Sequence, residues 1–214
     1  MAAPTSDRIR AFIALNLDPA LAAEVKKAQQ GLNSPEGAVR WINPEHLHLT
    51  LQFLGNVATD HLDTLVAALR RACSQTPPFQ VALEGVGCFP SSKSPRVIWI
   101  GIQGELEALR KLQRQIALET RTFGDHGDEH RFQPHLTIGR VRASGLAGRA
   151  VGQAIELAAV PKLGDWAVRH VLLVRSELSS HGAFYTTLAA VPLIIQIQGS
   201  EIQSGCPVSG PIDE

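Results

Sequence analysis

Two short segments repeat one four-residue pattern: a histidine, an apolar residue, a threonine and a second apolar residue. They are His48–Leu51 and His135–Ile138. A chain of this composition is expected to contain roughly 0.07 such tetrapeptides by chance, so the duplicate indicates shared chemistry rather than coincidence.

The residue types in this pattern suit proton transfer at a phosphate. Alternate residues of a strand point to the same face, so each copy presents an imidazole and a hydroxyl about 6–7 Å apart. Two imidazoles with pKa values of about 6.5 can act as acid and base in one turnover at neutral pH. Two hydroxyls can bind phosphoryl oxygens without adding charge. We therefore expect His48 and His135 to share one site, with Thr50 and Thr137 beside them, for displacement at phosphorus without a metal ion.

Each copy lies in a segment whose polarity alternates, which predicts a strand. The alternation is strict over His46–Phe53 and recurs over His135–Val141. In the first segment, the apolar side chains are expected to face the core: Leu47, Leu49, Leu51 and Phe53. The polar side chains are expected to face the opposite side: His46, His48, Thr50 and Gln52. A proline precedes each copy and a predicted helix follows it. This correspondence predicts two similar halves around a shared groove.

The rest of the sequence predicts paired strands with helices between them. Strands are expected over residues 8–17, 39–42, 79–89, 96–102, 166–178 and 183–191, and helices over 19–30, 60–74, 105–121 and 147–158. This order favours antiparallel sheets covered by helices on their outer faces, an α+β fold. We expect one domain over residues 1–192. The remaining tail, residues 193–214, is expected to add an edge strand or fray, and then to be disordered.

Composition limits the class of protein. The chain has 214 residues, of which 44% are hydrophobic, with 20 basic and 20 acidic residues. This is a globular composition, and zero formal net charge argues against a protein that coats long nucleic acid by charge alone. Five basic residues are local candidates to line a funnel for RNA: Lys93, Arg96, Arg131, Arg140 and Arg142.

The cysteines and the lengths of the apolar runs indicate in which cellular compartment the protein is expected. Cys73, Cys88 and Cys206 are widely spaced and form no CxxC pair, which favours reduced thiols. No apolar run reaches the ~18 residues that span a bilayer, and the N-terminus lacks the layout of a signal peptide. We expect a cytoplasmic protein with no membrane contact, and a monomer by default.

Several segments, taken in order, resemble one known superfamily. Trp41 with Pro44–Gly55, and later Phe132–Arg140, resemble the two H-x-T-x blocks of the 2H phosphoesterases. The opening strand and the closing hairpin of that superfamily also have counterparts: Arg10–Leu15, and Leu173–Leu178 with Gly182–Tyr185. Over residues 8–192 the chain most resembles the RNA 2′,3′-cyclic phosphodiesterase family, also called the bacterial 2′-5′ RNA ligase family. The resemblance implies a bilobal fold with two pseudo-symmetric antiparallel sheets and a central cleft.

The same resemblance implies an activity and the residues that perform it. The activity is metal-independent hydrolysis of an RNA 2′,3′-cyclic phosphate end to a 2′-phosphomonoester, and reversible 2′-5′ RNA ligation is a related possibility. His48 would be the proton donor to the leaving 3′-oxygen, and His135 the proton acceptor that activates water. Thr50 and Thr137 would hold non-bridging oxygens, and Arg140 would contact the phosphate. No cofactor is implied, and the partners are RNA ends or small cyclic nucleotides that carry the cyclic phosphate.

Arg140 must meet a geometric condition to join this site. It lies five residues after His135, so on a regular strand it would face away from the imidazole. A bulge or a strand end at Gly139 is needed to turn it toward the histidine. Without one, Arg140 is an ordinary surface cation.

Two other functions stay open on the sequence alone. A non-catalytic module could bind RNA phosphate ends with the same hydroxyls and Arg140. A metallohydrolase could use His46 and His48 as zinc ligands, although no convincing third ligand accompanies them. Three aromatic residues could stack on a base or pack in the core: Trp41, Phe53 and Phe132.

Overall fold

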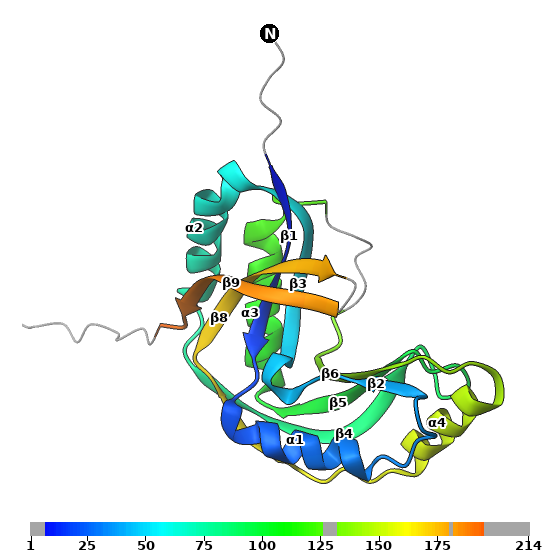
Figure 1. Cartoon of the computed structure of the whole chain (residues 1–214). Helices are drawn as coiled ribbons and strands as arrows, with labels where there is room; N and C mark the ends of the chain where they lie inside the picture. Colours follow the sequence, from blue (N-terminus) through cyan, green and yellow to red (C-terminus); the bar gives the residue numbers. More distant parts are fainter. Residues whose placement is uncertain (1–6, 126–131, 180–181, 195–214) are drawn as a thin grey trace, which may run out of the picture.

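The computed structural model describes residues 7–125, 132–179 and 182–194 and contains two antiparallel sheets (Figure 1). The four-stranded sheet has the order β3-β1-β8-β9 and the five-stranded sheet the order β2-β6-β5-β4-β7. The strands are β1 (Arg8–Asn16), β2 (Val39–Trp41), β3 (His48–Ala58), β4 (Phe79–Phe89), β5 (Val97–Gly104), β6 (His135–Val141), β7 (Gly164–Val168), β8 (His170–Ser179) and β9 (Gly182–Pro192). The predicted α+β fold with antiparallel sheets is confirmed.

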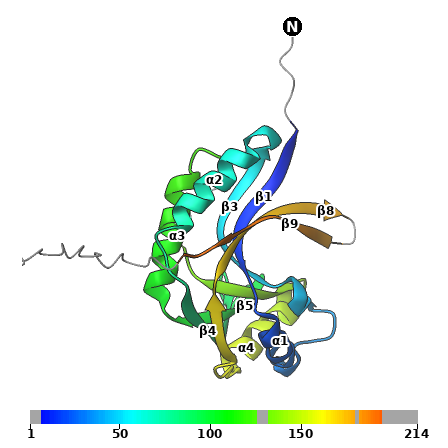
Figure 2. The ribbon, with the colours of Figure 1, turned by 90° about the vertical axis from the view of Figure 1, so that its left-hand side faces the viewer.

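Four α-helices lie on the outer sides of these sheets. They are α1 (Pro19–Gly31), α2 (Leu62–Cys73), α3 (Leu106–Thr120) and α4 (Gly145–Leu157), with short 3-10 helices η1 (Pro44–His46) and η2 (Thr59–His61). The pair α2 and α3 covers the four-stranded sheet, and α1 and α4 lie against the five-stranded sheet (Figures 1 and 2). Each helix directs an apolar stripe inward, as Leu65 and Leu69 of α2 and Leu109 and Leu112 of α3 are fully buried.

Buried residues form one large core and one small cluster. The large core joins both sheets to the helices and includes Leu49, Ile100 and Leu136. The small cluster consists of Phe12, Ala14 and Val174, and it lies on the other face of the four-stranded sheet, since β1 alternates its side chains between the two. The histidine of β3 lies on this second face.

The sequence predicted one strand over residues 166–178, and this prediction is wrong. The segment is divided at Arg169 into β7, which pairs with β4, and β8, which pairs with β1 and β9. The chain therefore passes from one sheet to the other at a single exposed residue. The carbonyl of Arg169 accepts a hydrogen bond from the Leu193 amide (2.8 Å), so the backbone polar groups stay paired where the ladders change.

The strand predicted to begin at His46 begins at His48 instead. The side chain of Asn43 accepts from the Glu45 amide (3.3 Å), and Pro44 begins the 3-10 helix η1, which holds His46 outside the sheet. The strand also continues past Phe53, where the alternating segment ends, to Ala58.

Only the first two residues of the predicted tail are described, and the choice between an edge strand and fraying stays open beyond them. Leu193 and Ile194 follow β9 without strand pairing, and the rest of the predicted tail, 195–214, lies outside the described residues. The domain boundary at 192 stays a prediction. Among the residues described, no helix is long and apolar enough to cross a membrane.

Candidate active site

The two histidines occupy equivalent places, each at the first residue of a strand. His48 begins β3 of one sheet and His135 begins β6 of the other, and Cα atoms of these two strands approach within 8 Å. The apolar residues between them and the threonines, Leu49 and Leu136, are fully buried. Burial of these leucines directs the histidine and threonine of each copy to the opposite face of the strand.

Each imidazole is oriented by the backbone two residues before it. The Nδ1 atom of His48 lies 3.1 Å from the carbonyl oxygen of His46, and the Nδ1 atom of His135 lies 2.7 Å from that of Gln133. A carbonyl oxygen only accepts, so Nδ1 must carry the proton in both rings. The Nε2 atom of each ring is thereby assigned to proton exchange with a substrate.

Aromatic side chains from neighbouring strands limit the rotation of both rings. Phe12 of β1 stacks on His48 with a centroid distance of 4.8 Å, and Tyr185 of β9 meets its edge at 5.1 Å. Phe89 of β4 meets His135 edge-on at 5.0 Å. These three contacts with the histidines were not predicted from the sequence; Phe12, for example, lies in a run of apolar residues and looks like an ordinary core side chain.

A bulge in β6 meets the condition set for Arg140. The register with β5 shifts between Ile98–Gly139 and Trp99–Thr137, which makes Ile138 the extra residue. Arg140 consequently lies opposite Val97, on the same face of the sheet as Thr137. The condition is therefore met, with the extra residue at Ile138 instead of Gly139.

Gln29 of α1 holds the bulge in place. Its Nε2 donates to the carbonyl oxygens of Ile42 (2.8 Å) and Ile138 (3.0 Å), and the Ile42 amide donates to the same Ile138 oxygen (3.0 Å). Gln29 is only 6% exposed. The sequence analysis assigned no role to Gln29, since a helical glutamine usually faces solvent.

A matching bulge in β3 corrects the prediction for Phe53. The register with β1 shifts between Ile13–Gln52 and Ala14–Thr50, which makes Leu51 the extra residue. Phe53 therefore lies opposite Phe12, with a ring distance of 6.2 Å, and is 62% exposed. The expectation that Phe53 faces the core is wrong because one inserted residue reverses the alternation of the strand.

Electrostatics connect the two copies. Burial lowers the pKa of His48 below its usual value, the His46 carbonyl opposes this effect, and the Arg140 guanidinium lowers the pKa further. A Coulombic effect of this kind requires Arg140 of the second half to lie near His48 of the first half. Burial and the Arg140 charge therefore both favour the neutral form of His48 in the free protein.

The remaining sequence candidates lie outside this group. Trp41 and Phe132 are partly buried against the core, in line with the packing interpretation. Trp41 lies over Gly139, where a Cβ would come within 2.9 Å of its ring. Among the candidates for a basic funnel, Lys93, Arg96 and Arg142 line one hollow beyond the end of β6, and Arg131 lies outside the described residues.

Metal ligands and thiols contribute nothing to the site in the part of the chain that is described. No group of three or more His, Cys, Asp or Glu residues able to hold a metal occurs there, and His46 is exposed in η1. Cys73 and Cys88 are free thiols, and burial raises the pKa of Cys73 to about 12. The third predicted thiol, Cys206, lies outside the described residues.

Comparison with known proteins identifies the family. Residues 17–179 match the 2′-5′ RNA ligase superfamily. The chain belongs to this superfamily. A relative from Methanothermobacter thermautotrophicus named RNA 2′,3′-cyclic phosphodiesterase is 34% identical over 181 residues, which cover 85% of this chain and 97% of the relative.

Two solved structures have the same fold as this superfamily member. TT0787 of Thermus thermophilus superposes with a TM-score of 0.71 at 29% identity, covering 86% of this chain and 98% of that one. LigT of E. coli complexed with 3′-AMP superposes with a TM-score of 0.70 at 25% identity, covering 87% and 99%. The recognition made from the two H-x-T-x blocks is therefore confirmed.

Proposed function

We propose that the protein hydrolyses 2′,3′-cyclic phosphate ends of RNA to 2′-phosphomonoesters. The observation that carries this proposal is the matched pair His48 and His135, each with Nδ1 held by a backbone carbonyl, on strands that lie side by side. Arg140 adds a positive charge beside His48. The name of the Methanothermobacter thermautotrophicus relative supports the same activity.

The reaction exchanges one phosphorus–oxygen bond for another. Nε2 of His135 accepts a proton from water while the water oxygen attacks phosphorus. The bond from phosphorus to the 3′-oxygen breaks in line with the attack, and Nε2 of His48 donates a proton to the leaving oxygen. The product carries a 2′-phosphate and a 3′-hydroxyl. This exchange balances without a metal ion, and the same exchange with an RNA 5′-hydroxyl in place of water is 2′-5′ ligation.

Three further side chains bind the phosphate in this proposal. The hydroxyls of Thr50 and Thr137 donate to non-bridging oxygens, and Arg140 offsets the negative charge that builds up on them. The phosphate also prepares His48 to act as an acid. Burial is the main cause of the lowered pKa of His48, and Arg140 adds a smaller effect in the same direction. A bound anion beside His48 raises this pKa, because it offsets the Arg140 charge and attracts the imidazolium form.

The activity is tested with purified protein, EDTA and an RNA oligonucleotide that ends in a 2′,3′-cyclic phosphate. We expect a 2′-phosphate product, and a loss of at least about 10²-fold in kcat for either His48→Ala or His135→Ala. The control is His170→Ala, which removes an exposed histidine at the start of β8. If the wild type binds the RNA end without turnover, the protein is instead a phosphate-end binding module.

The division of roles is tested with a substrate whose bridging 3′-oxygen is replaced by sulfur. A thiolate leaves without needing a proton, so the substitution should restore most of the rate lost in His48→Ala. It should not restore His135→Ala, because attack by water still needs a base. Rescue of His135→Ala instead would reverse the two assignments.

A further inference from the structure

Four cationic side chains surround a hollow at the end of β6 that is remote from the histidines. The hollow encloses about 200 Å³ between the loop that precedes β5 and the first turn of α4. Its polar lining consists of Lys93, Ser94, Arg96, Arg142, Ser144 and Arg149. No acidic residue is among the described residues that line it. In a chain with equal numbers of basic and acidic residues, this is a local excess of positive charge.

None of these four cations has an ion-pair partner in the part of the chain that the structure describes. Among the described residues, the ion pairs use other cations, such as Arg71 with Glu119 and Lys162 with Asp165. Like charges that gather without counter-charges repel one another, and an anionic ligand removes that repulsion. The hollow therefore suits a polyanion.

The loop that forms one wall of the hollow is packed firmly against α4. A Cβ at Gly152 would overlap the Ser92 carbonyl oxygen, so the helix and the loop are in direct contact there. The Ser92 hydroxyl also donates to the Glu156 carboxylate. The Glu156 carboxylate near the hollow is thus hydrogen-bonded to Ser92. The contacts also hold the backbone of the loop against α4, and this fixes the positions from which the surrounding cations extend.

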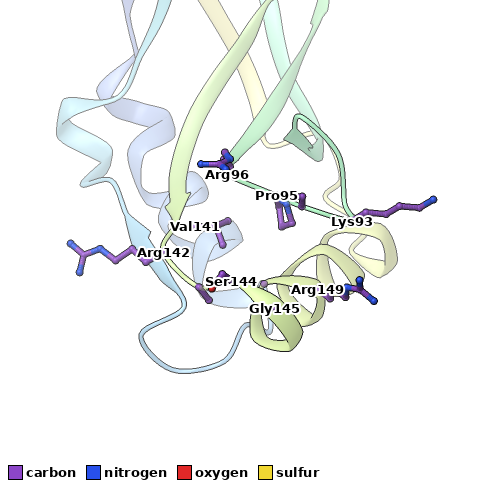
Figure 3. Close-up of a pocket in the computed structure, with 11 residues that line it drawn as sticks. Lys93, Pro95, Arg96, Val141, Arg142, Ser144, Gly145 and Arg149 are labelled. Atoms are coloured by element: carbon purple, nitrogen blue, oxygen red, sulfur yellow. The ribbon is translucent and has the colours of Figure 1, made fainter.

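The directions in which the four side chains extend favour an extended ligand over a small ion. Arg142 extends from one side of the hollow, Lys93 and Arg149 extend from the other, and Arg96 lies between them (Figure 3). Side chains that closed around a single phosphate would converge on one point. Side chains that diverge in this way can contact successive phosphates of a strand that crosses the hollow.

Other cations lead from the histidines to this hollow. Arg140 and Arg40 are opposite one another across β6 and β2, and both are exposed. The Arg142 amide bonds to the Ala38 carbonyl (2.8 Å), which continues this pairing and puts Arg142 two positions beyond Arg140, on the same side. The strand β6 has seven residues, so at about 3.3 Å per residue the hollow is roughly 20 Å from His135.

We infer that this hollow binds the phosphodiester backbone of the RNA strand whose cyclic phosphate end occupies the histidine site. The strand would follow β6 past Arg140 and Arg142 and cross the hollow roughly three to six nucleotides from its end, as the length of β6 and the rise per nucleotide require. Recognition of phosphates makes this contact independent of base sequence. The inference rests on the proposed function and adds to it that the substrate is an oligonucleotide rather than a cyclic mononucleotide.

The test compares two substrates in two matched variants. One variant combines Lys93→Gln, Arg142→Gln and Arg149→Gln; the control combines Arg70→Gln, Lys111→Gln and Arg114→Gln, which removes the same charge from exposed sites on α2 and α3. The substrates are a cyclic mononucleotide and a ten-nucleotide single-stranded RNA with a 2′,3′-cyclic phosphate end. We expect the ratio of kcat/KM for the oligonucleotide to that for the mononucleotide to fall at least about tenfold in the first variant only.

Two further measurements belong to the same experiment. The dependence of log kcat/KM on log salt concentration for the oligonucleotide should become shallower by about 2, since each lost contact to a single strand removes about 0.7 from the slope. Fluorescence anisotropy with the ten-nucleotide RNA measures the dissociation constant without turnover, and the first variant should raise it at least about tenfold. Oligonucleotides of increasing length should gain kcat/KM up to roughly six nucleotides in the wild type and less in the variant.

The outcomes separate this inference from the proposed function. An unchanged ratio, salt slope and dissociation constant in the first variant would overturn the inference and leave the hydrolytic activity intact. Equal losses in the control variant would also overturn it, because the effect would then be one of overall charge. If the wild type hydrolyses neither substrate, the proposed function fails, and the anisotropy measurement still decides whether the hollow binds the strand.

Discussion

The two halves of the molecule share one backbone arrangement around the histidine but differ in the side chain that follows the bulge. In both halves a histidine begins the strand, a threonine follows two residues later, and a bulge then reverses the alternation. The bulge brings the fifth residue after each histidine onto the histidine face. That residue is the exposed ring of Phe53 in the first half and the guanidinium of Arg140 in the second.

This difference indicates that the two halves contribute different kinds of group to the proposed site. In the proposed function, the second half supplies the positive charge that binds the phosphate, and Arg140 of this half also acts on His48 of the first half. The first half supplies aromatic surface from Phe53, Phe12 and Tyr185 around its histidine. Such surface suits a nucleoside more than a phosphate.

The largest effect in this comparison is expected at Arg140. Arg140→Gln should lower kcat/KM on the cyclic phosphate RNA by at least about 10²-fold, the scale for one group that stabilises developing charge. It should also raise the pKa of His48, because loss of a neighbouring cation favours the imidazolium form. Kinetics and an NMR titration of the His48 ring measure the two effects. Arg114→Gln is the control, and an unmoved His48 titration would contradict the contact between the halves.

A smaller effect is expected at the equivalent position of the first half. Phe53→Ala should lower kcat/KM by about five- to tenfold through KM, the lower end of what base stacking on an aromatic ring contributes. A substrate that lacks its terminal base should be unaffected. The free energy of unfolding should change by less than about 0.5 kcal/mol, since the ring is 62% exposed. An effect as large as that of Arg140→Gln would remove the distinction between the halves.

The support of the second bulge is tested at Gln29. Gln29→Leu removes both donated hydrogen bonds and should lower the free energy of unfolding by about 1–3 kcal/mol in urea denaturation. It should also lower kcat/KM by a few-fold, because Arg140 is displaced when the bulge loses this support. The ratio of kcat/KM for the oligonucleotide to that for the mononucleotide should not change. Gln30→Leu changes the exposed neighbour on the same helix and is the matched control. Equal effects of the two substitutions would show that Gln29 has no special role.

The smallest effect concerns stability against pH. The pKa of His48 is lowered in the folded state, so the unfolded state binds more protons below about pH 6.5, its ordinary value. The free energy of unfolding should therefore decrease as the pH falls from 7 through the folded pKa of His48. His48→Gln should reduce that decrease in denaturation curves recorded at several pH values. An unaltered pH dependence in the variant would contradict the burial of a neutral imidazole there.

Local patterns predicted most elements and the histidine pair, but not the paths between elements. Alternation over His135–Val141 and the apolar stripes of α2 and α3 are properties of neighbouring residues, and the structure agrees with them. The division at Arg169 depends on which sheet offers a partner to each part of the segment. That choice involves β4 and β1, which are far away in the sequence.

The sequence alone determined the residue types and spacing of the two motifs, and from them the superfamily and the chemistry that we propose. Only the tertiary structure decided which side chains join each histidine. One inserted residue in a strand reverses every later side chain, and whether a bulge forms depends on pairing with a distant strand and on bonds such as that from Gln29. For this reason the orientation of Arg140 was a condition to be tested, and that of Phe53 was predicted wrongly.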